Sequence, residues 1–149
     1  MAGCMPTMDD ELYQELILDY AKRPRNFGPL EGRTHGAEGH NALCGDEICV
    51  SLRIENGSVA DAKFTGSSCA ICTASAGVMT GVVKGKSCEE ALRLAEGFRE
   101  LARGGEPEGL PDKVRLLQGV SRFPQRVKCA VLPWETLVQA VEHPSDPTA

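Results

Sequence analysis

A hairpin signal between residues 48 and 65 is the feature that most limits how this 149-residue chain can fold. Four apolar residues alternate with other residues here: Ile48, Val50, Leu52 and Ile54. This is the period of a strand with one buried face. Asn56-Gly57 follows and supplies the positive φ values of a tight turn, so a second strand is predicted over 59–65.

A helix is predicted before the hairpin. Its apolar residues recur at every fourth position after an acidic start: Leu12, Leu16 and Tyr20. The helix ends before Pro24, because proline breaks a helix interior. The stretch 23–39 is rich in Gly, Pro and charge, which predicts a surface connection that can include a short strand.

Two helices are predicted directly after the hairpin. The first covers 69–83, and its small residues suit a buried helix that Ser67 or Ser68 can cap. The second begins at Ser87-Cys88-Glu89-Glu90, which has the pattern of a capping box, and ends near Arg103.

Two more helices are predicted towards the C-terminus. Asp112 can cap a short one, and Phe123-Pro124 is expected to break the chain after it. The last helix carries Trp134 and Leu137 at helical spacing, and Pro133 is acceptable only in its first turn. Cys129 is therefore predicted to lie at or just before a helix N-terminus.

Size and charge exclude several classes of protein. The length suits one domain, predicted over 1–143 with a disordered tail at 144–149. With 16 Lys plus Arg against 21 Asp plus Glu, the charge of −5 disfavours nucleic acid as a partner. No apolar run approaches the roughly 18 residues that a membrane helix needs, so a cytoplasmic protein with no membrane partner is expected.

The seven cysteines are predicted to serve chemistry or metal binding, because an odd number without a secretion signal argues against a disulfide framework. In Cys44-Gly45-Asp46, the glycine allows a sharp turn that brings a carboxylate back beside the thiol. Cys69 and Cys129 are both predicted at helix starts, where partial positive charge lowers a thiol's pKa. Asp46 can complete a tetrahedral zinc site with three thiolates.

Two alternative sites stay open at this point. Cys44, Cys49, Cys69 and Cys72 can form a structural zinc module, although Cys49 lies on the strand face opposite to Ile48 and Val50. Cys69 and Cys72 can also act as a CxxC thiol oxidoreductase.

The cysteines lie in three separated motifs, listed here in chain order: Cys44-Gly45-Asp46, Gly66-Ser67-Ser68-Cys69-Ala70-Ile71-Cys72-Thr73-Ala74-Ser75, and Lys128-Cys129-Ala130-Val131-Leu132-Pro133-Trp134. Residues 12–141 resemble the IscU/NifU-type iron–sulfur scaffold proteins. The resemblance rests on these three motifs and on the opening Leu12-Tyr13 and Pro24-Arg25-Asn26-Phe27-Gly28. Within this family the chain resembles the SufU branch more closely, in two details. It has an insertion at about 104–126, and it has Lys128 where IscU scaffolds typically have histidine.

The resemblance implies an α+β fold, a small antiparallel sheet of about three strands packed against several helices. It implies that Cys44, Asp46, Cys69 and Cys129 bind zinc, that Cys44 accepts sulfur, and that Arg126 lies near the metal. Cys44, Cys69 and Cys129 would also hold a transient [2Fe-2S] or [4Fe-4S] cluster. The implied partners are a cysteine desulfurase of the SufS/IscS type and downstream cluster-assembly or carrier proteins.

The resemblance implies a sulfurtransferase-like sulfur acceptor or a scaffold rather than a classical enzyme. One departure concerns Cys72, which stands where this branch usually carries serine. Cys72 can therefore be an extra ligand, or it can form a disulfide with Cys69 that would disable the site.

Overall fold

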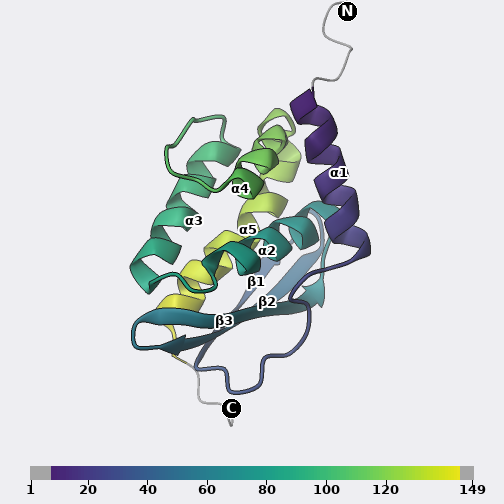
Figure 1. Ribbon diagram of the computed structural model, residues 1–149. Coiled ribbons are helices and arrows are strands. Elements are labelled where there is room, and N and C mark those ends of the chain that lie inside the picture. The colour runs from purple at the N-terminus through teal and green to yellow at the C-terminus, as the bar shows by residue number, and fades with distance from the viewer. Residues whose placement is uncertain (1–7, 145–149) are drawn as a thin grey trace, which may run out of the picture.

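The computed structural model describes residues 8–144, which form a three-stranded antiparallel sheet with helices over one face (Figure 1). The strands are β1 (His35–Asn41), β2 (Asp46–Glu55) and β3 (Ser58–Ser67), with β2 in the centre. The helices are α1 (Met8–Lys22), α2 (Ala70–Val83), α3 (Cys88–Ala102), α4 (Asp112–Leu116), the 3-10 helix η1 (Leu117–Arg122) and α5 (Pro124–Glu142). The α+β class expected from the sequence is confirmed.

The predicted hairpin is confirmed as β2 and β3. Asn56 and Gly57 connect the strands with φ values of 52° and 77°, in the left-handed region that an Asn-Gly turn supplies. In β2 the side chains of Ile48, Val50 and Leu52 are buried at 3%, 0% and 0% exposure. They lie on the face that the helices cover, so the sequence alternation marks which side of the sheet forms the core.

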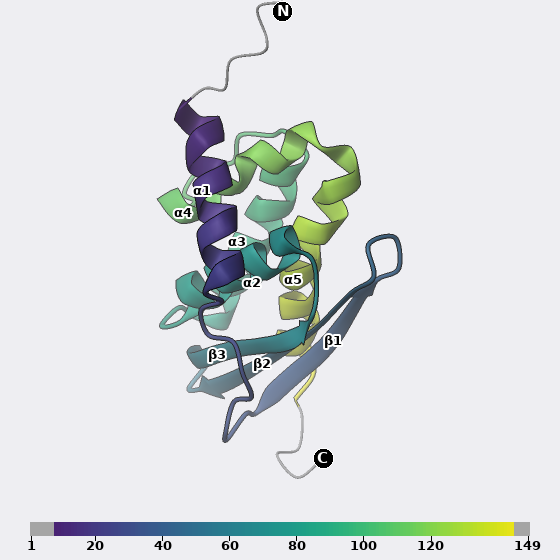
Figure 2. The same ribbon diagram turned by 90° about the vertical axis from the view of Figure 1, so that its right-hand side faces the viewer.

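The core lies between this face and the helices, and α5 runs through its middle (Figure 2). Trp134 of α5 is fully buried and stacks on Phe98 of α3, with ring centroids 4.9 Å apart and planes 13° from parallel. The ring of Tyr20 in α1 fills the space over Gly77 of α2, where a Cβ atom would lie 2.6 Å from it. These packed pairs fix the helices relative to one another.

The start of α5 differs from the sequence prediction. Phe123-Pro124 was expected to break the chain, but Pro124 opens α5 at a first-turn position where proline loses no helical hydrogen bond. Cys129 consequently lies in the second turn of a helix rather than at or before its N-terminus. Pro133 lies inside the helix, not in its first turn.

Two predicted caps are wrong, and one is confirmed. Cys69 itself is the N-cap of α2, in place of Ser67 or Ser68, and Asp112 is the first residue of α4 rather than its cap. Ser87 caps α3 as predicted, because its hydroxyl accepts a hydrogen bond of 3.1 Å from the Glu90 amide.

The stretch 23–39 is a connection that ends in a strand, as the sequence allowed: the edge strand β1 begins within it at His35 and continues to Asn41. At the other end of the chain, Pro144 forms an isolated bridge with His35, and the rest of the predicted tail lies outside the described residues. None of the described helices is long and apolar enough to cross a bilayer.

We expect Gly39→Ala to destabilise the protein by about 1–3 kcal/mol, because α5 lies directly against β1 at this position. A Cβ atom here would overlap the buried Thr136 hydroxyl and lie 3.0 Å from Leu132 Cδ1. Urea unfolding followed by circular dichroism measures the change. Gly81→Ala is the matched control, since a Cβ at Gly81 has open space around it and alanine favours a helix. Equal stability of the two variants would contradict the close approach of α5.

Candidate metal centre

Three side chains that can ligate a metal converge at one end of the sheet. Cys44 lies in the turn between β1 and β2, Asp46 begins β2, and Cys129 comes from α5. Their ligand atoms all lie within 4.8 Å of one another, and the Sγ atoms of Cys129 and Cys44 are 2.9 Å apart. Within the described residues, a turn, a strand and a helix therefore bring together three of the four predicted ligands.

Asp46 points into the protein because it lies two residues before Ile48 in β2, so both side chains are on the same face of the sheet. Its side chain is on the helix-covered face and Asp46 is only 1% exposed. Gly45, with φ of 69°, makes the sharp turn between Cys44 and Asp46. Asp46 Oδ1 accepts a 2.8 Å hydrogen bond from the Cys69 amide, so the carboxylate ties the start of β2 to the start of α2.

Cys69, the fourth predicted ligand, lies beside this group. Its Sγ is 3.9 Å from Asp46 Oδ2 and accepts a 3.4 Å hydrogen bond from the Cys72 amide. Cys69 is not one of the three residues whose ligand atoms all lie within 4.8 Å. Its thiol nevertheless borders the carboxylate that belongs to the group, at the amide-rich end of α2.

Cys129 is fully buried, and its environment differs from the one predicted. Burial, followed by hydrogen bonding to Cys44 and Asp46, raises the pKa of Cys129 above that of an ordinary thiol. The expected lowering by a helix N-terminus is wrong, because Cys129 lies in the second turn of α5 among acidic neighbours. A bound cation would compensate these neighbours and would favour the thiolate.

Asn41 is a residue at the site that sequence reasoning missed. It ends β1, is 9% exposed, and donates from Nδ2 to Cys129 Sγ at 3.5 Å. Its Oδ1 accepts a 3.3 Å hydrogen bond from the Leu43 amide, so the same side chain also shapes the turn that carries Cys44. A polar residue three positions before Cys44 was the available signal, but its burial depends on α5.

A buried hydrogen-bond chain holds α5 against α2 beside the site. The Trp134 indole N–H donates to Ser75 Oγ at 3.0 Å, and the Ser75 hydroxyl donates to the Ala130 carbonyl at 2.6 Å. Pro133 lacks the N–H that would bond to the Cys129 carbonyl one turn earlier. Ser75 therefore holds α5 at the point where its regular hydrogen bonding is interrupted. Neither Asn41 nor Ser75 was among the predicted site residues.

Arg126 lies one turn before Cys129, on the exposed surface of α5. Its guanidinium interacts with Cys129, and this interaction, together with the nearby Cys69 and Cys44, raises the pKa of Arg126. Arg126 thus supplies positive charge beside Cys129, on the solvent-exposed side of the cysteine cluster.

The alternative sites have less support from the structure. Cys49 lies three residues after Asp46 in β2, so its side chain is on the opposite, uncovered face of the sheet, away from Cys44, Asp46 and Cys129. Cys72 is fully buried, and burial raises the pKa of its thiol to about 12, so Cys72 itself is a poor nucleophile. All the cysteines in the described region are free thiols.

The donor set fits zinc, which binds cysteine thiolates and carboxylate oxygens in tetrahedral sites. Cys44, Asp46 and Cys129 supply three such donors, and Cys69 borders them. Fold and site together define a small α+β protein with a group of thiols and a carboxylate that can bind a metal at one end of a three-stranded sheet.

The chain belongs to the NifU-like N-terminal domain family, whose model matches residues 12–145. It is 40% identical to the zinc-dependent sulfurtransferase SufU of Bacillus subtilis over 89% of this chain and 90% of that protein. It is 38% identical to the iron–sulfur cluster assembly scaffold protein IscU of Streptococcus pyogenes, over 89% of this chain and 84% of the relative.

A solved structure supports the same assignment. The crystal structure of the N-terminal part of a NifU-like protein from Brucella abortus matches with a TM-score of 0.78 and 27% identity. The match covers 91% of this chain and 96% of that one. The resemblance stated from the cysteine motifs is therefore confirmed at the level of the family.

Proposed function

We propose that this chain is an iron–sulfur cluster assembly protein of the SufU type. It binds zinc through Cys44, Asp46, Cys69 and Cys129, and it accepts sulfur from a cysteine desulfurase in the cytoplasm. The observation that carries the proposal is the convergence of Cys44, Asp46 and Cys129 within 4.8 Å. The 40% identity to a zinc-dependent sulfurtransferase supports zinc as the metal and sulfur as the transferred atom.

Cys44 is the acceptor in this proposal. It lies in a turn and is partly exposed, whereas Cys129 and Asp46 are buried. Bound zinc keeps the cysteine ligands in the thiolate form at neutral pH. The other three ligands and Asn41 hold the site in shape while the Cys44 side chain reaches the partner.

Sulfur transfer then needs no general base. The Cys44 thiolate attacks the terminal sulfur of the donor's persulfide, so a new S–S bond forms on Cys44 and the donor's S–S bond breaks. The donor cysteine leaves as a thiolate, and the terminal S–H proton stays on the transferred sulfur. Arg126 lies where it can stabilise the negative charge on the reacting sulfur atoms.

A scaffold role is the second candidate function. The name of the Streptococcus pyogenes relative supports it, since that protein is called a cluster assembly scaffold. In this role Cys44, Cys69 and Cys129 hold a transient [2Fe-2S] or [4Fe-4S] cluster as cargo for a downstream carrier protein, because thiolates suit both zinc and iron–sulfur clusters.

The test uses the complete protein purified without reducing agent or oxygen. We expect about one zinc per chain by metal analysis, and one persulfide per chain by mass spectrometry after incubation with a SufS-type desulfurase and cysteine. A protein that holds no zinc but carries an iron–sulfur chromophore would favour the scaffold role. A protein that holds neither metal nor transferred sulfur would overturn both candidates.

A further inference from the structure

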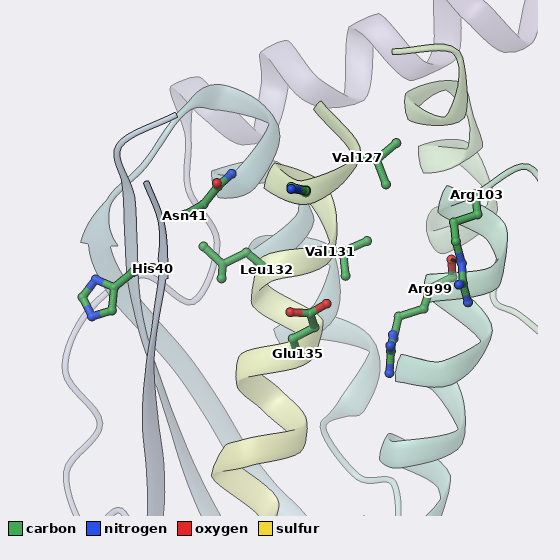
Figure 3. A pocket seen from close by; sticks show the side chains of 9 residues that line it. His40, Asn41, Arg99, Arg103, Val127, Val131, Leu132 and Glu135 are labelled. Carbon is green, nitrogen blue, oxygen red and sulfur yellow. Dashed lines mark hydrogen bonds between the residues drawn. The ribbon is translucent and has the colours of Figure 1, made fainter. Parts of the chain in front are cut away.

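A groove crosses the exposed face of α5 next to the metal centre (Figure 3). Figure 3 shows β1, with His40 and Asn41, on one side of α5, and α3, with Arg99 and Arg103, on the other. The groove has a volume of about 320 Å³. Apolar side chains of α5, such as Val131, contribute to its lining, so it offers both charge and apolar surface to an occupant.

The groove is basic although the chain is acidic. Arg99, Arg103 and Lys128 line it against the single carboxylate of Glu135, whereas the whole chain has a net charge of −5. Arg99 is 3.5 Å from Glu96 in an exposed ion pair, which is a weak interaction. Arg103 donates from Nε to the Arg99 carbonyl, so its charge is not neutralised by that bond. A local charge opposite to that of the chain indicates an anionic occupant.

The groove borders the metal centre through two residues. Asn41 lines it and donates to Cys129 Sγ, and Lys128, another lining residue, directly precedes Cys129 in α5. An occupant that pairs with Lys128 therefore lies within one residue of a proposed ligand. The groove is in position to hold a partner while that partner reaches Cys44.

We propose that this groove docks an acidic segment of the sulfur-donating protein. This rests on the proposed function and adds the surface by which the donor is recognised. The basic side chains come from two helices, with Arg99 and Arg103 one turn apart at the end of α3, and all are exposed. Charges spread along a groove suit an extended chain with several carboxylates better than one small anion.

The test separates binding from transfer. Affinity for a SufS-type desulfurase is measured by calorimetric titration, and persulfide formation on the protein is measured by mass spectrometry. We expect Arg99→Glu and Arg103→Glu each to weaken binding about tenfold, with the zinc content unchanged and persulfide formation restored at saturating desulfurase. Raising the salt concentration should weaken wild-type binding and reduce the difference between wild type and variants.

Arg93→Glu is the matched control, because Arg93 is exposed on the same helix and lines a different hollow. Equal weakening by all three variants would show an effect of net charge alone and would overturn the inference. Wild-type affinity in Arg99→Glu and Arg103→Glu would also overturn it. Displacement of the desulfurase by inorganic phosphate, at ionic strength matched with chloride, would assign the groove to small anions instead.

Failure of the proposed function gives a different result. A wild-type protein that binds the desulfurase through this groove but forms no persulfide would refute sulfur acceptance and support the docking surface. A wild-type protein that accepts sulfur while binding is insensitive to the groove variants would support the function and refute the docking surface. Absence of any binding would refute both.

Discussion

Cys44→Ala is expected to abolish persulfide formation on this protein. Cys44 is the partly exposed thiol of the three-residue group, and its turn position allows it to meet a partner's sulfur. Cys129 cannot replace it, because that thiol is fully buried and out of reach of a partner's sulfur. The measurement is the mass of the intact protein after incubation with desulfurase and cysteine, compared with the wild type.

Cys49→Ala is the control for the Cys44 variant. Cys49 is also a partly exposed thiol near the start of β2, but it lies on the opposite face of the sheet from Asp46. The Cys49 variant should form as much persulfide as the wild type. Persulfide that persists in Cys44→Ala at the wild-type level would assign acceptance to another cysteine, and Cys69 would be the first to test.

Cys129→Ala should lower the affinity for zinc by well over the roughly 10–100-fold that loss of an outer hydrogen-bond partner costs. The substitution removes a proposed ligand and leaves a buried space beside Asn41 and Asp46. Competition with a chromophoric chelator measures the dissociation constant, and metal analysis after dialysis gives the stoichiometry.

The result for Cys129→Ala decides between two zinc sites. In the proposed site, Cys49→Ala leaves zinc affinity unchanged, because Cys49 points away from the other thiols. A structural module built from Cys44, Cys49, Cys69 and Cys72 predicts the reverse pattern. Full zinc retention in Cys129→Ala with loss in Cys49→Ala would therefore refute the proposed ligand set.

The alternation of side chains along β2 made much of the fold predictable from sequence. The alternation of Ile48, Val50 and Leu52 predicts both the strand and its buried face, and the same alternation places Cys49 on the opposite face. The Asn56-Gly57 turn defines the hairpin because few residue pairs adopt its φ values easily. These signals are local, so a single sequence contains them.

The errors concern residues whose surroundings come from distant parts of the chain. Pro133 was expected in a first turn, but packing of Trp134 on Phe98 and the Ser75 bond to the Ala130 carbonyl support a helix that continues through it. The pKa of Cys129 was expected to fall, whereas burial raises it. Asn41 became a site residue only because α5 covers it. Local patterns do not contain these contacts.

The spacing of the converging side chains gives the metal centre a thermodynamic role. Cys44 and Cys129 are 85 positions apart in the chain, yet their sulfur atoms are neighbours. In the chain-entropy model, joining two such points costs an unfolded chain about 4.5 kcal/mol, so the donor set exists only after most of the domain has folded. Metal affinity and folding are then linked, so a chelator that removes the metal lowers the free energy of unfolding. A metal bound at this centre would therefore stabilise the fold as well as hold the thiols together.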